Sequence, residues 1–199
     1  MPSPELVVTC FTKRGEGYLL IKPDCLRVPR DPASAFSVFA VFDGHNGVLA
    51  AVYSKEHLLE HVMSALLPNI GREDRLRVGD SRCILDTQGG ELQLLTMDHS
   101  LEENAEERER VTASGGEVGR LKVGPLWCWP GGLCLSRSIG DMDVGEFIVP
   151  IPHVKQLSNT GGRLIIASDG IWDALSNEAA AQACRGLPAE LAAKLVVKD

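Results

Sequence analysis

The sequence lacks the features that mark several common classes of protein. Its six cysteines form no Cys-x-x-Cys pair, which argues against a zinc ribbon or a disulfide framework and favours reduced thiols in an intracellular compartment, the cytoplasm or the nucleus. No apolar run is long enough to cross a membrane, and the N-terminal apolar stretch is too short for a signal peptide. There is no basic stripe, and the formal net charge of -7 argues against nucleic acid as a partner.

What is present is the composition of a globular domain. The chain has 199 residues, of which 44% are hydrophobic and 24% charged, enough for one domain with a substantial core. Strand-like and helix-like segments mix without a βαβ rhythm, so the pattern predicts an α+β fold of antiparallel sheets covered by helices. The expected strands are 6–11, 18–21, 36–42, 77–85 (interrupted by Gly79-Asp80) and 92–96, and the expected helices are 48–67, 101–113, 177–185 and 189–198.

Local signals describe the middle of the chain in more detail. Ser100 and Glu103 form a capping-box pattern, which predicts the start of the second helix. The charged run 106–110 that follows is typical of a solvent-facing side of a helix. Residues 115–135 are rich in Gly, Trp and Pro and predict a long loop or flap. The three tryptophans are expected to pack in the core or the flap: Trp127, Trp129 and Trp172.

Two buried strands are predicted to end directly at an acidic residue. The apolar run 36–42 leads into Asp43-Gly44-His45, and the run 163–167 leads into Ser168-Asp169-Gly170. A strand holds such a carboxylate rigidly, and the following glycine lets backbone and ligand approach closely. If the two strand ends lie side by side, their oxygen atoms form a site suited to Mg²⁺ or Mn²⁺.

Four acidic motifs of this kind follow one another in a single short domain. They are Asp43-Gly44-His45, Gly79-Asp80-Ser81-Arg82, the segment 135–141 (LSRSIGD) and the segment 168–173 (SDGIWD), and Thr96-Met97-Asp98-His99 adds to the pattern. With these residues the sequence resembles the metal-dependent protein serine/threonine phosphatases (PPM type, protein phosphatase 2C), in a plant-like form. The resemblance extends from about residue 10 to the C-terminal end.

The resemblance implies a fold, a metal site and a role for each matching residue. The family fold is a four-layer α-β-β-α arrangement, an antiparallel β-sandwich flanked by helices, here over one domain spanning 1–199. By position, Asp43 is expected to bridge two Mg²⁺ or Mn²⁺ ions and His45 to act as the general acid for the leaving alkoxide. The other implied residues are Gly44 (through its carbonyl), Asp169 and Glu16 for metal, Asp80 and Asp173 for a weaker third metal, and Arg14 or Lys13 for phosphate.

The same resemblance implies an activity. The expected reaction is hydrolysis of phosphoserine and phosphothreonine in proteins by a metal-activated water, since two metals supply both the nucleophile and the charge neutralisation that this inert ester needs. The expected partner is a phosphoprotein substrate, with kinases or regulatory proteins as further candidates. The chain is expected to be a monomer that binds neither nucleic acid nor a membrane.

The sequence departs from the family pattern at several places. Gly17 stands where the family usually has Asp, and the segment 71–77 replaces a helix and a strand, whose loss would expose sheet edges. The flap is shortened around 122–124. The C-terminal end, at Asp199, comes before a family Asp that binds metal directly. The domain is therefore expected to be internally shortened near 71–77 and truncated at the C-terminus.

Three alternatives stay open, and the first two follow from these departures. The chain could be a catalytically impaired pseudophosphatase or regulatory binding module of the same family. It could fail to fold stably. Separately, the segment 57–61 fits the His-x-x-Glu-His pattern of zinc peptidases, in which His57 and His61 share one helix face; the competing interpretation places both on the flank of an amphipathic helix.

Overall fold

The computed structural model describes residues 6–12, 17–26, 30, 35–45, 47–65, 74–77, 79–141, 144–156 and 161–197. The chain divides into two compact units, each described here by itself. The first unit comprises Met1–Glu73, Arg82–Leu95 and Gln156–Asp199, and the second comprises Asp74–Ser81 and Thr96–Lys155. Within the described ranges, no helix combines the length and the apolar character that crossing a bilayer requires.

The first unit is built on a four-stranded sheet with the order β1-β10-β5-β6. Its strands are β1 (Leu6–Phe11), β5 (Arg82–Thr87), β6 (Leu92–Leu94) and β10 (Gly162–Ala167). β10 pairs antiparallel with β5, but β1 pairs parallel with β10. The expectation of purely antiparallel sheets is therefore wrong for this pair. β1 and β10 are far apart in sequence, so no short hairpin connection forces them to be antiparallel.

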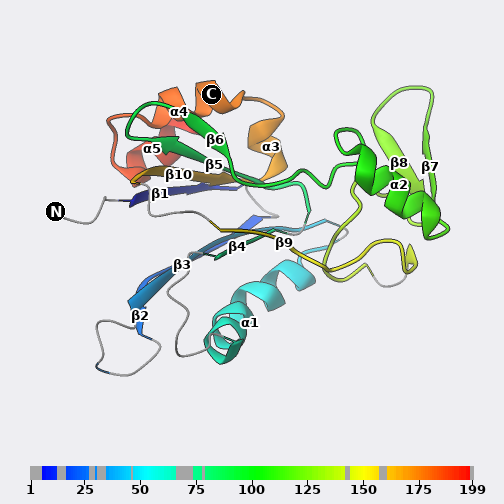
Figure 1. Cartoon of the computed structure of the whole chain (residues 1–199), viewed down its shortest axis with the longest axis horizontal. Coiled ribbons are helices and arrows are strands. Elements are labelled where there is room, and N and C mark those ends of the chain that lie inside the picture. Colours follow the sequence, from blue (N-terminus) through cyan, green and yellow to red (C-terminus); the bar gives the residue numbers. More distant parts are fainter. Residues whose placement is uncertain are drawn as a thin grey trace. The chain divides into compact units, whose positions relative to one another are not determined.

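Two further layers and the covering helices complete this unit. β2 (Gly17–Leu26) and β3 (Ala35–Asp43) form an antiparallel pair, against which α1 (Leu49–Ala65) packs. β3 also contacts β1 and β10. On the four-stranded sheet, α5 (Ala189–Val196) contacts β1 and α4 (Asn177–Cys184) contacts β6 (Figure 1). The order of layers is therefore helix, sheet, sheet, helix, and the predicted α+β fold of strands flanked by helices is confirmed.

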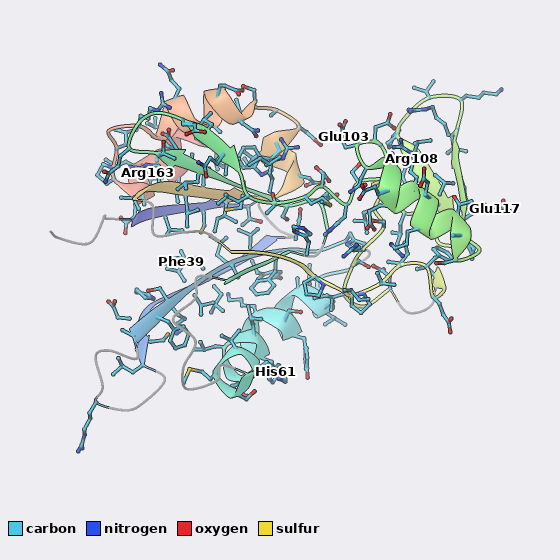
Figure 2. All side chains as sticks on the ribbon, viewed as in Figure 1. Phe39, His61, Glu103, Arg108, Glu117 and Arg163 are labelled. Atoms are coloured by element: carbon cyan, nitrogen blue, oxygen red, sulfur yellow. The ribbon has the colours of Figure 1, made fainter. Side chains whose placement is uncertain are left out.

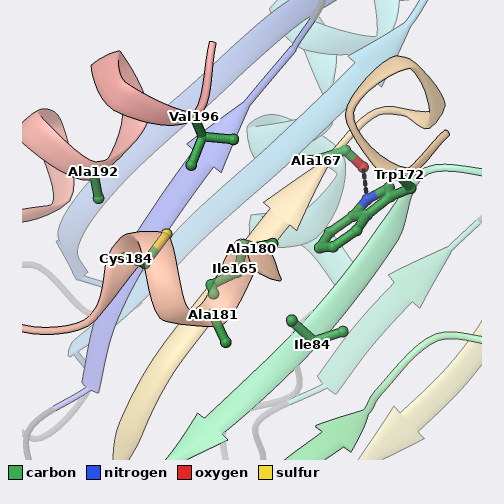
Figure 3. Packing of buried hydrophobic residues seen from close by; sticks show 9 residues of the cluster. All are labelled: Ile84, Ile165, Ala167, Trp172, Ala180, Ala181, Cys184, Ala192 and Val196. Carbon is green, nitrogen blue, oxygen red and sulfur yellow. Dashed lines mark hydrogen bonds between the residues drawn. The ribbon is translucent and has the colours of Figure 1, made fainter. Parts of the chain in front are cut away.

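The alternation of side chains along each central strand creates a core on both faces of the four-stranded sheet. Ile84 and Ile165 face α4 and α5, whereas Leu85 and Leu164 belong to a separate buried cluster with Val8. The helices approach closely because their buried residues are small, and Figure 3 shows them over the sheet: Ala180, Ala181, Cys184 and Ala192, each with no exposed surface.

The second unit has its own apolar cluster. α2 (Ala105–Ala113) packs beside a hairpin of β7 (Glu117–Arg120) and β8 (Leu126–Trp129), and β4 (Asp74–Arg77) pairs with β9 (His153–Gln156). The expectation of a long loop over 115–135 is wrong for this hairpin, which the Gly- and Pro-rich composition concealed. The buried cluster consists of Leu101, Val111, Cys128, Leu133, Phe147 and Ile148.

Helix α2 does not start at the predicted capping box. Its N-cap is Asn104, whose side chain accepts a hydrogen bond from the Glu107 backbone N–H at 3.1 Å. The prediction at Ser100 is wrong because the backbone there is held in extended pairing. Ser100 bridges to Leu135, and the backbone N–H of Leu101 donates to Cys134 at 2.8 Å.

The sequence predicted that the charged run 106–110 on α2 faces solvent, and this is wrong for Glu107. Glu107 is only 5% exposed and accepts hydrogen bonds from Arg110, Ser136 and Arg137. Burial alone would raise the pKa of Glu107, but these hydrogen bonds and the arginine charges outweigh it and lower the pKa to about 2. Arg137 also donates to the carbonyl of Ile151 at 3.0 Å, so one carboxylate ties α2 to the segments at 136–137 and 151.

Glu107→Gln is expected to destabilise the second unit by about 3 kcal/mol at neutral pH, since it leaves two arginines without their charged partner. The folded-state pKa lies below the ordinary value of 4.5. The stabilisation from Glu107 is therefore complete above about pH 4.5 and is lost as the pH falls towards 2. Urea unfolding at pH 7, 5 and 3 should show a smaller loss of stability with acid in the variant. Equal acid sensitivity of wild type, Glu107→Gln and the exposed control Glu106→Gln would contradict this account.

Candidate functional site

The first predicted acid stands at the end of β3. Asp43 is the last residue of that strand and pairs across the hairpin with Gly17, the first residue of β2. Asp43 and Gly44 are half-buried, and His45, two residues beyond the strand, is exposed. The strand therefore holds the Asp43 carboxylate in place while leaving it partly open to solvent.

The second predicted acid stands at the end of β10. Asp169 opens the short helix α3 (Asp169–Trp172) after the fully buried Ser168, and the Gly170 backbone N–H donates to its Oδ1 at 2.5 Å. The Asp173 backbone N–H donates to the Asp169 carbonyl at 2.8 Å. The two aspartates are therefore one helical turn apart on the same face. Asp169 is half-buried and Asp173 exposed.

Trp172 fixes this acidic turn to the sheet. Its indole N–H donates to the carbonyl of Ala167, the last residue of β10, at 2.9 Å (Figure 3). The Arg82 guanidinium lies 5.4 Å from the centre of the Trp172 ring and donates to Asn177 at the start of α4. Trp172 is 8% exposed, which confirms the prediction that it packs in the core. The position of Asp169 is thus set by a packed tryptophan as well as by the strand.

The parallel pairing of β1 and β10 brings the two acidic strand ends to one edge. Phe11 and Ala167 are the last paired residues, so Thr12 and Ser168 leave the sheet side by side. A Cβ atom placed on Gly17 would collide with the Thr12 side chain, 2.6 Å from its Cβ and closer still to its hydroxyl oxygen. Thr12 therefore lies against Gly17, the cross-strand partner of Asp43.

This edge offers oxygen ligands of the type that Mg²⁺ and Mn²⁺ prefer. Carboxylates stand at the ends of β3 and β10, and the Thr12 hydroxyl oxygen, which lies against Gly17, is buried without a hydrogen-bond partner in the part of the chain that is described. A buried polar atom left unpaired is costly unless a ligand or a water satisfies it. Carboxylate and hydroxyl oxygens are the donor types that a hard divalent cation accepts.

The remaining predicted ligands lie in the second unit or outside the described residues. Asp80 belongs to the second unit, where it follows Gly79 in a bend and is half-buried. Glu16, Arg14 and Lys13 lie outside the described residues. Among the residues that are described, no three His, Cys, Asp or Glu side chains gather into a group that could hold a metal.

The zinc alternative on α1 finds no support. His57 stacks on the Tyr53 ring, with centroids 4.3 Å apart, and His61 is exposed on the helix (Figure 2). Within the described part of the chain, His57 and His61 belong to no group of three or more metal-binding side chains. The two histidines are flank residues of a helix that packs on β2 and β3.

Three of the six free cysteines are unreactive as nucleophiles. Burial, with a contribution from Cys83, raises the pKa of Cys10 to about 12, and burial also raises the pKa of Cys128 and Cys184. A protonated thiol is a poor nucleophile.

Sequence analysis missed Thr12. No motif contains it, and its side chain becomes significant only because the strand pairing places it on Gly17. The available signal was indirect: a glycine stands at position 17, where an acid was expected, six positions after the last residue of a strand.

Comparison with known proteins gives consistent results. The family described as Protein phosphatase 2C matches residues 77–196. "Probable protein phosphatase 2C 33" of Oryza sativa subsp. japonica is 68% identical over 239 residues, covering 95% of this chain and 55% of the relative. "Probable protein phosphatase 2C 5" of Arabidopsis thaliana is 60% identical over 239 residues, covering 95% and 56%. The chain spans little more than half the length of these relatives.

Solved structures share the fold at low sequence identity. A C. elegans sex determining protein superposes with a TM-score of 0.76 at 22% identity, covering 94% of this chain and 58% of that one. A serine-threonine phosphatase 2C from Toxoplasma gondii has a TM-score of 0.65 at 17% identity, covering 100% and 90%. At these identities the likeness establishes the fold alone.

Trp172→Phe is expected to lower the free energy of unfolding by about 1 kcal/mol, because it keeps a packed ring but loses the hydrogen bond to Ala167. Trp172→Ala is expected to lower it by about 3–5 kcal/mol through the cavity that it leaves. Urea denaturation followed by circular dichroism measures both. Trp127→Phe, on β8 of the second unit, is the matched control; indistinguishable stabilities for Trp172→Phe and Trp172→Ala would refute the anchoring role.

Proposed function

Because the chain belongs to the protein phosphatase 2C family, we propose that it hydrolyses phosphoserine and phosphothreonine in proteins with the help of Mg²⁺ or Mn²⁺. The observation that supports the proposal is that two strands of the first unit, β3 and β10, lead directly into acidic residues, Asp43 and Asp169, at the edge where Thr12 lies against Gly17. Carboxylates that are held by rigid strands and are partly open to solvent suit a large phosphorylated substrate.

Two divalent cations would supply an activated water and neutralise charge on the phosphoryl oxygens. In this proposal Asp43, the Gly44 carbonyl and Asp169 would hold the two cations. Asp173, one turn after Asp169, and Asp80 would serve a third, weaker site. Glu16 would contribute to metal binding through water.

Protein side chains would handle the substrate and the proton. His45 is exposed two residues after Asp43, where it can donate a proton to the departing serine or threonine oxygen. Arg14 or Lys13 would hold the phosphate, since a positive charge there neutralises the dianion. Neither Ser nor Cys has to form a covalent intermediate in this scheme.

The partner that follows from this activity is a phosphoprotein, and kinases or regulatory proteins are further candidates. We propose a monomer, since the layers of the first unit need no second copy to cover the described faces of the four-stranded sheet. Six free cysteines favour a reducing compartment, the cytoplasm or the nucleus.

A second candidate function is a pseudophosphatase that binds phosphoproteins or regulators without turnover. Two observations favour it. The described residues contain no group of three metal-binding side chains. The alignment with the rice relative covers 239 positions, more than the 199 residues of the chain, so it contains gaps on this side. A shortened domain can keep a binding surface after it loses turnover.

Activity distinguishes the two functions. With a phosphothreonine peptide and Mn²⁺, the wild-type chain is expected to release phosphate, and Asp43→Asn and Asp169→Asn are each expected to reduce turnover by at least about 100-fold, as for loss of a group that stabilises charge in the transition state. Asp24→Asn, an exposed substitution on β2, is the control. Folded wild-type protein without Mn²⁺-dependent turnover would support the pseudophosphatase instead.

Metal should also stabilise the chain. Carboxylates close together repel one another by roughly 4 kcal/mol per pair at 4 Å and an effective dielectric of about 20, and a bound cation removes that repulsion. At a Mn²⁺ concentration about 100 times Kd, the stabilisation is about 2.7 kcal/mol. Differential scanning fluorimetry should show a rise in melting temperature for wild type and Asp24→Asn but not for Asp43→Asn. A rise of equal size in Asp43→Asn would place the metal elsewhere.

A further inference from the structure

Gly17 is prevented from carrying a side chain by Thr12. A Cβ on Gly17 would lie 2.6 Å from the Thr12 Cβ and 3.0 Å from its Cγ2, and nearer still to the hydroxyl oxygen. Cβ contacts under 3.0 Å essentially do not occur in proteins, so one of the two residues would have to move. Rotation of the Thr12 side chain would not clear the space, because its Cβ is fixed by the backbone.

The backbone of Gly17 is not the obstacle. Gly17 opens strand β2 in the extended conformation, which any residue can adopt, and it is not among the positive-φ glycines of the described residues. The glycine is therefore needed for space. The need for glycine at position 17 comes from Thr12, the residue that follows β1.

The Thr12 hydroxyl points to the place that a side chain at position 17 would occupy. Cross-strand partners such as Gly17 and Asp43 project their side chains to the same face, with Cβ atoms about 5 Å apart. The Thr12 oxygen lies at the Gly17 end of that pair. It is therefore within reach of the Asp43 carboxylate through one intervening oxygen.

The alternation of side chains along β1 predicts the same direction for the Thr12 side chain. Val8 packs into the buried cluster formed with Leu85 and Leu164, and Thr12 follows it on the same face, four residues on. This face contains the residues that pack away from α4 and α5. The hydroxyl oxygen is buried, with no hydrogen-bond partner in the described ranges.

We propose that Thr12 is a positioning residue of the cation site, and that its hydroxyl acts from the space that a side chain at position 17 would occupy. The inference rests on the proposed metal-dependent function and adds to it a residue from β1. Thr12 would hydrogen-bond a water of the cation that Asp43 holds. A hydroxyl is neutral, so it orders water beside Asp43 without adding a further negative charge, and the cation is bound less tightly than by an acid.

Titration with MnCl₂ tests the proposal on the full 199-residue chain. Free Mn²⁺ is measured by electron paramagnetic resonance for wild type, Thr12→Val, Thr12→Ser, Asp43→Asn and the control Asp24→Asn. Thr12→Val keeps the shape and loses the hydroxyl, so its Kd for Mn²⁺ should rise about fivefold, the effect of one net hydrogen bond. Thr12→Ser should bind within about twofold of wild type.

A stability readout without metal separates positioning from packing. If Thr12 served only to fill space, Thr12→Val would bind Mn²⁺ as wild type does. Replacement of an unpaired buried hydroxyl by a methyl group should leave the melting temperature without metal unchanged or higher. Unchanged stability together with weaker Mn²⁺ binding, restored in Thr12→Ser, is the expected result; equal Mn²⁺ affinity in Thr12→Val and wild type would overturn the proposal.

The Asp43 variant distinguishes failure of this inference from failure of the proposed function. Loss of Mn²⁺ binding in Asp43→Asn with unchanged binding in Thr12→Val overturns the role of Thr12 and leaves the metal site in place. Unchanged binding in Asp43→Asn, or no binding by wild type, overturns both.

The steric relation has its own test, which does not involve metal. Gly17→Ala should lower the urea midpoint clearly, whereas the double variant Thr12→Gly with Gly17→Ala should recover most of the loss, since it removes the colliding Cβ. Gly89→Ala, at a turn where the new Cβ meets nothing closer than 3.8 Å, is the control. A Gly17→Ala variant as stable as Gly89→Ala would show that Thr12 does not occupy this space and would overturn the inference.

Discussion

The parallel pairing of β1 with β10 is the constraint on which the first unit depends. Parallel neighbours end at the same edge of a sheet, so the chain leaves β1 at Thr12 beside the point where it leaves β10 at Ser168. Thr12 in turn lies against Gly17, the cross-strand partner of Asp43, so the end of β3 lies near the same edge. Asp43 and Asp169 are therefore brought to one edge by strand pairing, although they are more than 120 positions apart in sequence.

The same molecule uses carboxylates in two different ways. Glu107 and Asp86 are buried and paired with arginines, Glu107 with Arg110 and Arg137, Asp86 with Arg185 at 2.8 Å. Such pairing holds segments together, and it lowers the pKa of Glu107 to about 2. Asp43 and Asp169 follow strands and are half-buried, so both carboxylates are partly open to solvent. Solvent access and rigidity together are what a cation site requires.

Local sequence patterns predicted what local interactions determine. The strand 6–11 and the helices at 177 and 189 matched the structure because apolar period, caps and proline act over a few residues. The parallel partner of β1 and the extended pairing at Ser100 are contacts between distant segments. They override a capping signal that is sound in isolation. Glu107 shows the same limit, since its partner Arg137 lies 30 positions away.

The candidate site follows this division. Asp43 and Asp169 could be named from the strand-then-acid pattern, because the pattern itself creates a rigid carboxylate. Thr12 could not, because nothing local distinguishes it from any threonine after a strand. Its importance comes from its contact with Gly17, which belongs to the other sheet. Positions 12 and 17 are coupled, since a side chain at position 17 and the Thr12 side chain cannot occupy the same volume. A neutral hydroxyl beside Asp43 adds no charge attraction for a cation, but it also adds no repulsion of the Asp43 carboxylate when the cation is absent.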